Sequence, residues 1–458
     1  MHMLEQQGSA GAVDRGGQGP DSAAGELERL TIAKAVKNLV PLIVICYFIA
    51  YLDRTNIGIA ALQMNKDLGM TASMFGFGAG LFFLFYFSME VPSNLLMTRY
   101  GVRRWVARIM VSWGFVAGGM AFVRGPTSFY FMRALLGLAE AGFFPAMVFY
   151  LTQWFPSSYR GRAISYLQVA GPLSYLIGAP ISGTLLGLDG LLGLRGWQWM
   201  FILEAVPAII LSVVVLARLP DTPADARWLT DDQRDWLVAR LTTEEEQRRS
   251  VREYTVVQAM FSPRVLVLGL VHFSIVLSVF GVGFFLPQIV KEFGLTNAQT
   301  GLVSAIPYVA GSVGILWWGR RSDAKGERRL HTAIPLALAS VALVGAGLTG
   351  QLELKMLAFS VAAFGAYGCV SAFWTLPSIF LSGASIAGAI AIISCIGALG
   401  GFAGPWIMGV VKDITGNFSA ALMFLAGMDA VAVFAVLALP GFTGSSQRER
   451  DTTTKTDK

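Results

Sequence analysis

The residues best suited to chemistry are arginines and carboxylates that interrupt apolar stretches of the chain. Asp53 and Arg54 lie side by side in "ICYFIAYLDRTNIGIAAL", and Arg133 and Glu140 interrupt a later stretch in the same way. A guanidinium stays protonated and can hold a carboxylate through two hydrogen bonds. A buried carboxyl group beside an arginine can take up and release a proton, since burial and the positive charge act on it in opposite directions. The four side chains could therefore bind an anion and carry protons.

The spacing of these residues predicts two stripes on helices, because residues three, four and seven apart share a face. One stripe consists of Tyr47, Tyr51, Arg54 and Gly58, with Asp53 about 100° to the side. The other consists of Arg133, Gly137, Glu140 and Phe144, with roughly 10.5 Å of rise between the two charges. Two such helices can face one aqueous cavity. The alternative is that Asp53–Arg133 and Glu140–Arg54 are structural ion pairs, although buried pairs are weak evidence for net stability.

The elements that must position these charges are transmembrane helices. Of the 458 residues, 54% are hydrophobic and 14% charged, whereas roughly 25% are charged in a soluble domain. A bilayer is crossed by about 20 mainly apolar residues. Twelve runs are long enough, at about 39–64, 74–98, 105–123, 128–151, 163–188, 199–218, 264–290, 298–318, 331–350, 355–381, 384–411 and 419–440. We predict an all-α integral membrane protein with twelve transmembrane helices in two pseudo-symmetric six-helix bundles.

Composition divides the chain into five parts. A polar tail at 1–30, expected to be disordered, precedes an N-terminal bundle at 31–218, and a C-terminal bundle at 264–440 precedes a second tail at 441–458. Between the bundles, 219–263 is expected to hold an amphipathic helix against the membrane face. Lys and Arg cluster in the loops after the second, fourth and eighth spans, which predicts that both termini and the linker are cytoplasmic. The net charge of +6 comes in such short clusters and does not indicate nucleic-acid binding.

A loop motif recurs in the two halves. "NLLMTRYGVRR" (94–104) and "GRRSDAKGERR" (319–329) each follow the second span of their half, and in each a glycine precedes a basic pair. The second copy fits G-x-x-x-D-x-x-G-x-[RK]-[RK], whereas the first has Asn94 and Thr98 in place of the first Gly and the Asp. Two six-helix halves are typical of parallel-repeat transporters, whose substrate site lies near the midplane between the halves. The chain resembles the major facilitator superfamily over nearly its whole length.

Several further stretches carry a closer resemblance, to the anion:cation symporter family. They read "YLDRTNIG", "EVPSNLL", "RALLGLAEAGFFPA", "GWQWMFILEAVPA", "RWLTDDQ" and "FWTLP…GALGGFAGP". The "VPSN" turn and the missing first-loop Asp are most similar to the tartrate, 4-hydroxyphenylacetate and phthalate permease branch. The resemblance implies a monomeric, proton-coupled symporter that imports a small organic carboxylate across a bacterial inner membrane. It also implies proton coupling by Asp53 and Glu140, with Arg54 and Arg133 binding substrate or pairing with those acids.

Other side chains could line the substrate path or form a gate. The further candidates for substrate binding are Tyr47, Tyr51, Tyr86, Gln168, Trp374 and Ser394. Cavity lining or helix packing is the alternative for these residues, and core packing is the alternative for Phe373 beside Trp374. His272 could titrate, but a lone His within a span is more often a hydrogen-bonded structural group. The candidates for a cytoplasmic gate are Glu90, Arg104, Asp323 and Arg328, with Asp323 expected to pair across the cytoplasmic face.

The sequence leaves the substrate and the direction of transport open. In the eleventh span, "SCIGALGG" lacks the asparagines that the family commonly has near Ser394 and Ala398, which favours an acid with few hydroxyl groups, short-chain or aromatic. An uncoupled facilitator or an exporter is the alternative within transport. The chain has no P-loop, no H-E-x-x-H and no G-x-S-x-G, so the sequence favours neither an ATP-driven pump nor an enzyme. We expect no metal and no cofactor.

Overall fold

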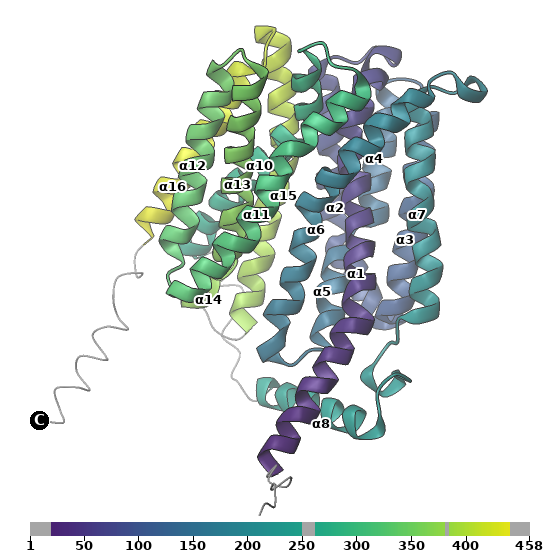
Figure 1. The fold of residues 1–458 in the computed structure, drawn as a ribbon, viewed down its shortest axis with the longest axis vertical. Helices are drawn as coiled ribbons and strands as arrows, with labels where there is room; N and C mark the ends of the chain where they lie inside the picture. Colours follow the sequence, from purple (N-terminus) through teal and green to yellow (C-terminus); the bar gives the residue numbers. More distant parts are fainter. Residues whose placement is uncertain (1–19, 250–261, 381–383, 440–458) are drawn as a thin grey trace, which may run out of the picture.

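The computed structural model describes residues 20–249, 262–380 and 384–439, and the regular elements in these ranges are helices (Figure 1). The first half contains α1 (Pro20–Asp67), α2 (Ala72–Tyr100), α3 (Val102–Gly119), α4 (Pro126–Glu140), α5 (Phe143–Thr152), α6 (Ser157–Leu185) and α7 (Gly196–Arg218). The linker contains α8 (Asp231–Arg249). The second half contains α10 (Pro263–Lys291), α11 (Asn297–Lys325), α12 (Arg329–Leu348), α13 (Leu352–Phe373), α14 (Pro377–Phe380), α15 (Ala384–Thr415) and α16 (Ser419–Ala438). Within the described residues, 12 segments are long and apolar enough to cross a membrane, which confirms the predicted fold class.

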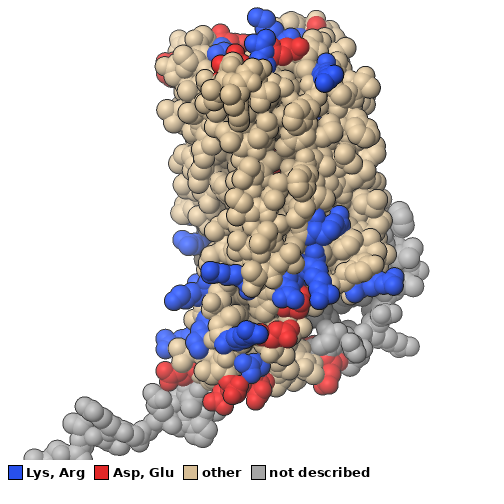
Figure 2. All heavy atoms as spheres, turned by 90° about the vertical axis from the view of Figure 1, so that its right-hand side faces the viewer, with Lys and Arg blue, Asp and Glu red and all other residues tan. Residues whose placement is uncertain are grey.

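The bundle has two distinct ends. We call the end that carries α8 and the start of α1 the proximal end, and the opposite end, with the turn between α1 and α2, the distal end (Figure 1). On the face shown in Figure 2, charged side chains gather at both ends and leave a broad band without charges between them, with many Lys and Arg toward the proximal end. This is the distribution expected of a protein whose apolar band lies in a bilayer.

The first helix begins earlier than predicted. Because α1 starts at Pro20, the prediction of a disordered tail is wrong for 20–30, while 1–19 and the predicted tail at 441–458 lie outside the described residues. The polar composition of this segment suggested disorder, but tertiary contacts order it. Within this segment, Glu28 accepts a hydrogen bond from the hydroxyl of Tyr159 on α6 (3.0 Å). Just after it, Lys34 donates one to Gln233 on α8 (2.9 Å).

The linker helix α8 lies across the proximal end of the first half (Figure 1). Trp228, just before α8, stacks on Trp154 with 5.5 Å between the ring centres, and Leu237 is fully buried. Glu244 accepts a hydrogen bond from the backbone N–H of Ser157 at the start of α6 (3.0 Å). Apolar residues of the linker, Trp228 and Leu237, thus face the protein and fix α8 to the first half.

The two halves meet mainly along α2 with α15 and α6 with α11, and α1 also contacts α10. Close contacts lie toward the distal end, where a Cβ atom at Gly409 would collide with the backbone carbonyl of Ala72. Asp413, near the end of α15, accepts hydrogen bonds from the backbone N–H groups of Ala72 (3.1 Å) and Ser73 (2.9 Å), which open α2. The boundary between the halves is therefore closed at its distal end.

Two spans are broken, and they are the fourth span of each half. In the first half α4 and α5 are separated at Ala141 and Gly142, and in the second half α13 and α14 are separated at 374–376. Gly142 has a φ of 84°, in the left-handed region that favours glycine. In transporters, discontinuous membrane helices commonly form the substrate site, because the break exposes backbone groups near the midplane. The first break immediately follows the residue that proves central to the site below.

Candidate functional site

The centre of the candidate site is an ion pair between Arg54 on α1 and Glu140 at the end of α4. Nε and Nη2 of Arg54 lie 2.6 Å and 2.5 Å from the same oxygen, Oε1 of Glu140. Both side chains are buried, with 9% and 0% of their surface exposed. The other oxygen, Oε2, has no hydrogen-bond partner in the described part of the chain. The Glu140–Arg54 pair considered from the sequence is thus present, with one carboxylate oxygen open to another donor.

Aromatic rings surround the Arg54 guanidinium. Its Cζ atom lies 5.2 Å from the ring centres of Tyr51 and Phe82 and 4.9 Å from that of Tyr86. A cation over an aromatic face is stabilised by about 0.5–2 kcal/mol, more when the site is dry. The rings therefore stabilise the charge without occupying the donors that face Glu140. Tyr51 and Tyr86, both predicted as substrate residues, lie beside the arginine.

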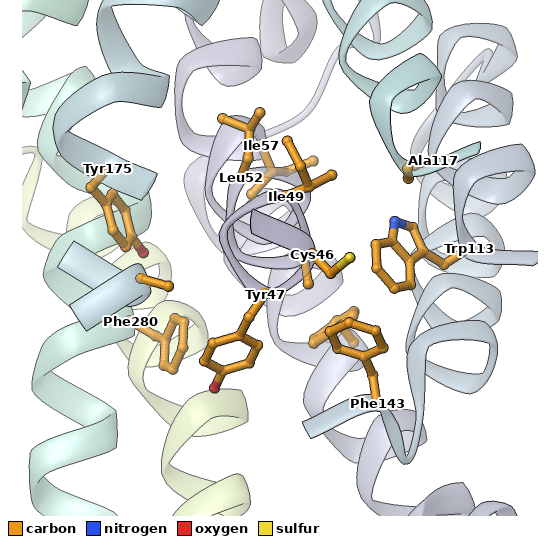
Figure 3. Close-up of a cluster of buried hydrophobic side chains, with 14 of the residues drawn as sticks. Cys46, Tyr47, Ile49, Leu52, Ile57, Trp113, Ala117, Phe143, Tyr175 and Phe280 are labelled. Atoms are coloured by element: carbon orange, nitrogen blue, oxygen red, sulfur yellow. The ribbon is translucent and has the colours of Figure 1, made fainter. Parts of the chain in front are cut away.

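Tyr47 lies one helical turn before Tyr51 and belongs to the wall behind the site. Its ring meets that of Tyr51 edge-on at 5.0 Å and stacks on Phe144 at 5.3 Å. Figure 3 shows Tyr47 among buried rings, with Trp113 and Phe143 on one side of α1 and Tyr175 on the other. The side chain of Tyr47 is 3% exposed. Tyr47 therefore supports the position of Tyr51. Its predicted role in binding substrate stays a prediction.

Arg133 shares the ring of Phe82 with Arg54. Its Cζ atom lies 5.2 Å from the centre of that ring, and Nη2 donates a hydrogen bond to the backbone carbonyl of Ala79 (3.0 Å). Arg133 is 1% exposed, and its Nε has no hydrogen-bond partner within the described residues. The Asp53–Arg133 pair considered from the sequence does not form in the described structure, because the arginine turns to α2 and the acid turns to α3.

Asp53 is held by an indole. Its Oδ2 accepts a hydrogen bond from Nε1 of Trp113 on α3 (2.7 Å), while Oδ1 has no partner in the part of the chain that the structure describes. Adjacent residues on a helix point about 100° apart, so Asp53 reaches α3 and Arg54 reaches α4. Sequence reasoning missed Trp113, because a tryptophan in an apolar run gives no sign that its N–H has a polar partner.

The break in the fourth span overturns one sequence expectation. A continuous helix would place Phe144 on the stripe of Arg133 and Glu140, but α4 ends at Glu140. Ala141 has an extended backbone, with a ψ of 134°, so the chain turns immediately after Glu140. Phe144 belongs to α5 and stacks on Tyr47 instead. The stripe itself, from Arg133 to Glu140, is retained because it lies wholly within α4.

Trp374 lies in an aromatic cluster at the break that follows α13. Its ring centre is 4.8 Å from that of His272 and 5.3 Å from that of Phe373. Nδ1 of His272 lies within hydrogen-bonding distance of the backbone oxygen of Ile393, at 3.1 Å. His272 is thus a hydrogen-bonded member of this cluster, the structural alternative that the sequence favoured. Trp374 is half-buried and does not touch the Arg54–Glu140 pair in the described structure.

Gln168 and Ser394 are half-buried, on α6 and α15 respectively. Neither side chain forms a hydrogen bond with Arg54 or Glu140 among the residues that the structure describes. Their contact with substrate therefore stays a prediction.

The predicted gate residues do not pair across the proximal end. Asp323 was expected to do so, but it pairs with Arg328 in its own loop (2.7 Å), because the turn at Gly326, with a φ of 63°, brings the two together. Glu90 is half-buried and Arg104 exposed, and neither forms an ion pair within the described ranges. The neighbour of Arg104, Arg103, pairs with Asp221 (3.2 Å).

Two further buried carboxylates escaped sequence reasoning, one in the last span of each half. Glu204 on α7 accepts hydrogen bonds from Nδ2 of Asn56 (2.9 Å) and Oγ of Ser182 (2.6 Å). Asp429 on α16 accepts hydrogen bonds from two serine hydroxyls of α10 (2.7 and 2.9 Å). An acid within an apolar run was the signal that singled out Asp53, and it applies equally to both. No cluster of His, Cys, Asp and Glu in the described residues could hold a metal ion.

The fold and the buried charge cluster define a polytopic membrane protein with a polar site inside its helical bundle. The family model of the Major Facilitator Superfamily matches residues 43–405. The chain belongs to this superfamily and is a membrane transport protein, not an enzyme.

Two individual relatives and one solved structure are similar to this chain over most of its length. An Agrobacterium vitis protein described as a candidate tartrate transporter is 44% identical over 414 residues, which cover 90% of this chain and 95% of the relative. A quinolone resistance transporter of Acinetobacter baumannii is 39% identical over 402 residues, covering 88% and 93% of the two chains. A bacterial homologue of the human lysosomal transporter Spinster, in an inward-facing and occupied conformation, has a TM-score of 0.71 at 15% identity, covering 87% of this chain and 95% of its own. The first relative confirms the resemblance to the tartrate branch, and the last shows the fold alone.

Proposed function

We propose that the chain is a proton-coupled symporter that imports a small organic carboxylate by alternating access. The observation that carries this proposal is the buried Arg54–Glu140 pair, in which one carboxylate oxygen meets the arginine and the other has no hydrogen-bond partner among the described residues. When Glu140 is protonated, its hold on Arg54 weakens and a ligand carboxylate can take its place. When the ligand leaves, Glu140 releases the proton and pairs with Arg54 again. Arg54 thus binds either its own acid or the transported one.

Charge balance links the ligand to the proton. With all four groups ionised, Arg54, Arg133, Asp53 and Glu140 carry no net charge. A carboxylate that enters this buried site adds a negative charge, and an uncompensated buried ion costs several kcal/mol. A proton on Glu140 or Asp53 removes that charge, so each ligand carboxylate calls for about one proton. Arg133 offers a second cation, which suits a ligand with a second carboxylate.

Alternating access follows from the way the halves meet. We assign the proximal end to the cytoplasm, since Lys and Arg gather there (Figure 2), and place the protein in a bacterial inner membrane as a monomer. The distal contacts of α2 with α15 then close the periplasmic side. In the opposite state these contacts open, and Glu90, Arg104, Asp323 and Arg328 form the cytoplasmic gate. In this scheme the cytoplasmic gate is open when the distal end is closed, so those four residues do not pair across the proximal end here.

The proposed substrate is a short-chain or aromatic acid with few hydroxyl groups. This class of substrate is supported by the aromatic side chains around Arg54 and by the absence of amide side chains near Ser394 and Ala398. The name of the Agrobacterium vitis relative adds tartrate as the first compound to try.

The decisive experiment is uptake of labelled tartrate and of labelled 4-hydroxyphenylacetate into proteoliposomes. We expect accumulation of at least one acid only under an imposed proton gradient, acidic outside, and its loss when a protonophore is added. Accumulation that ignores the gradient would overturn the coupling. Galactonate outcompeting both acids would overturn the proposed substrate class.

Export is the second candidate, favoured by the 39% identity to the quinolone resistance transporter. The same pair of acids and arginines could exchange an outgoing anion for incoming protons. One gradient, acidic outside, separates the two directions. Under it an importer fills the vesicles with the acid, whereas a proton-antiporting exporter inserted in the same orientation depletes them.

A further inference from the structure

A small cavity lies between the halves, a few residues beyond Arg54 along α1 toward the distal end. Asn56 and Ser182 line it from the first half, and Ser304 and Tyr308 line it from the second. Its volume of about 10 Å³ is the space open to the centre of a water-sized particle. This is close to the smallest volume that holds one water molecule or one small ion.

Three buried polar atoms at this cavity have no hydrogen-bond partner in the described part of the chain. They are Oδ1 of Asn56, the hydroxyl of Tyr175 and Oγ of Ser304, from residues that are 2%, 4% and 1% exposed. Buried polar groups in proteins are nearly always hydrogen-bonded. Three such atoms around one cavity therefore indicate a bound ligand that can interact with all of them.

The surroundings favour a positively charged ligand. Asn56 and Ser182 both direct their donors at Glu204 (2.9 and 2.6 Å), which leaves Oδ1 of Asn56 to act as an acceptor. No Lys, Arg or His of the described residues forms an ion pair with Glu204, whether from α1, α3, α6 or any other element. Oxygen atoms beside a carboxylate without a cationic partner are the usual surroundings of a hard cation.

The neighbouring titratable groups also favour a positively charged ligand. Asp53, three residues before Asn56 on α1, is a second acid that interacts electrostatically with Glu204. The other titratable groups at the cavity are the hydroxyls of Tyr175 on α6 and Tyr308 on α11. A cation near Glu204 relieves the repulsion between the two acids, whereas a neutral water alone does not.

We infer that this cavity and Glu204 bind one monovalent cation, either Na⁺ among the oxygen atoms or a proton on Glu204 with water in the cavity. The ligands come from both halves, which are held together here by the stacked rings of Tyr175 and Tyr308, 4.2 Å apart. Opening the distal end separates Ser304 from Asn56 and dismantles the site. The cation therefore binds the distally closed state in preference, and stabilises it.

The test is the thermal unfolding of the purified full-length protein in nanodiscs, with NaCl or choline chloride at equal ionic strength and over a range of pH. We expect Na⁺, or acid in the absence of Na⁺, to raise the unfolding temperature of the wild type, and Glu204→Gln to lose that response. Ser304→Ala removes one unpartnered hydroxyl and should need roughly 2- to 10-fold more cation for the same response, the effect of one neutral hydrogen bond. Ser340→Ala is its matched control, because the Ser340 hydroxyl donates to the Ala426 carbonyl (2.7 Å) away from the cavity.

A response to Na⁺ at fixed pH assigns the site to Na⁺, and a response to acid alone assigns it to the proton. Equal responses of wild type and Glu204→Gln to both would overturn the inference. If Glu204→Gln does not fold, the two serine variants decide, and equal responses from them would overturn it too. The readout needs no organic acid, so its outcome is independent of the proposed substrate.

Discussion

Nε of Arg54 donates a hydrogen bond to one oxygen of Glu140 (2.6 Å), and Nη2 forms an ion-pair contact with the same oxygen at 2.5 Å. In a bidentate pair each of the two donors would meet its own carboxylate oxygen. Here the second oxygen of Glu140 has no partner within the described residues, although the residue is fully buried. Such a one-sided pair holds both charges in place but is easier to exchange than a bidentate one, as an anion site requires.

Arg54→Lys tests the need for a planar guanidinium. Lysine keeps the charge but acts as a point charge without the fixed fork of donors. Losing one hydrogen bond to a charged group costs about 1.5–3 kcal/mol, so we expect the apparent affinity for substrate to fall by roughly 10- to 150-fold. The measurement is the concentration dependence of uptake in proteoliposomes. Arg195→Lys, whose arginine pairs with Asp67 at 3.5 Å near the distal surface, is the control and should match wild type.

Glu140→Gln tests the coupling. The amide has nearly the size of the acid but cannot release a proton, so accumulation driven by a proton gradient should be abolished. Exchange of labelled for unlabelled substrate across vesicles without a gradient should continue, because it requires binding and not net proton movement. Glu292→Gln, at an exposed pair with Lys412, is the control. Full gradient-driven accumulation in Glu140→Gln would remove Glu140 from the mechanism.

Gly142→Ala tests the break between α4 and α5. Gly142 has a φ of 84°, and an added Cβ atom would collide with the side chain of Ser93. We expect a loss of about 1–3 kcal/mol in stability, read as a lower unfolding temperature. Gly125→Ala is the matched control, since Gly125 has an extended backbone with a φ of 171° and open space at the Cβ position. Equal unfolding temperatures for the two variants would contradict the role of the break.

Asp413→Asn tests the distal closure. The carboxylate accepts hydrogen bonds from the first N–H groups of α2, where the helix dipole also favours a negative charge. Its loss should favour the distally open state by about 1 kcal/mol, a roughly fivefold change in population. Spin-label distances between the distal ends of α2 and α15 measure that population. Asp67→Asn changes an acid whose partners, Trp197 and Arg195, lie within the first half, and should leave the distances unchanged.

Glu327→Gln tests a pH-dependent contact outside the spans. Partial burial opposes ionisation of Glu327, but the backbone N–H of Leu330 and the imidazole and backbone N–H of His331, at the start of α12, hold the pKa of its carboxyl below the usual value. A lowered folded-state pKa means stabilisation that is present above the unfolded value of about 4.3 and lost as the pH falls through the folded one. The variant should therefore unfold at a lower temperature than wild type at neutral pH, and the difference should shrink below about pH 4. A difference that persists in acid would rule out the carboxylate as its cause.

The sequence predicted the spans because an apolar run of about 20 residues has few alternatives. It could not predict the break after Glu140, since Ala141 and Gly142 interrupt neither the length nor the hydropathy of the run. The sequence also could not predict the start of α1, because Glu28 in the polar segment at 20–30 contacts Tyr159 on α6, far along the chain.

In the candidate site, too, some contacts could be predicted from the sequence and others could not. Helical spacing placed Arg54 beside Tyr51, and of the two ion pairs considered as the structural alternative, Glu140–Arg54 forms and Asp53–Arg133 does not. The pairing of Asp53 with Trp113 depends on how α1 and α3 are rotated against each other, which no single sequence specifies. Glu204 and Asp429, in contrast, could have been found from the sequence, since each is an acid in an apolar run. They were overlooked because neither has an arginine nearby in the sequence.

Helix α1 is continuous over 48 residues, a length of about 72 Å at 1.5 Å per residue. Only about 30 Å of it fits within the hydrocarbon core, so much of the rest projects beyond the bilayer at the proximal end (Figure 1). A small change of tilt in a rod of this kind displaces its projecting end by more than its middle. A fluorophore or a rigid fusion placed there would amplify the rocking of the helix that carries Arg54, offering a handle for single-molecule recording of individual turnovers.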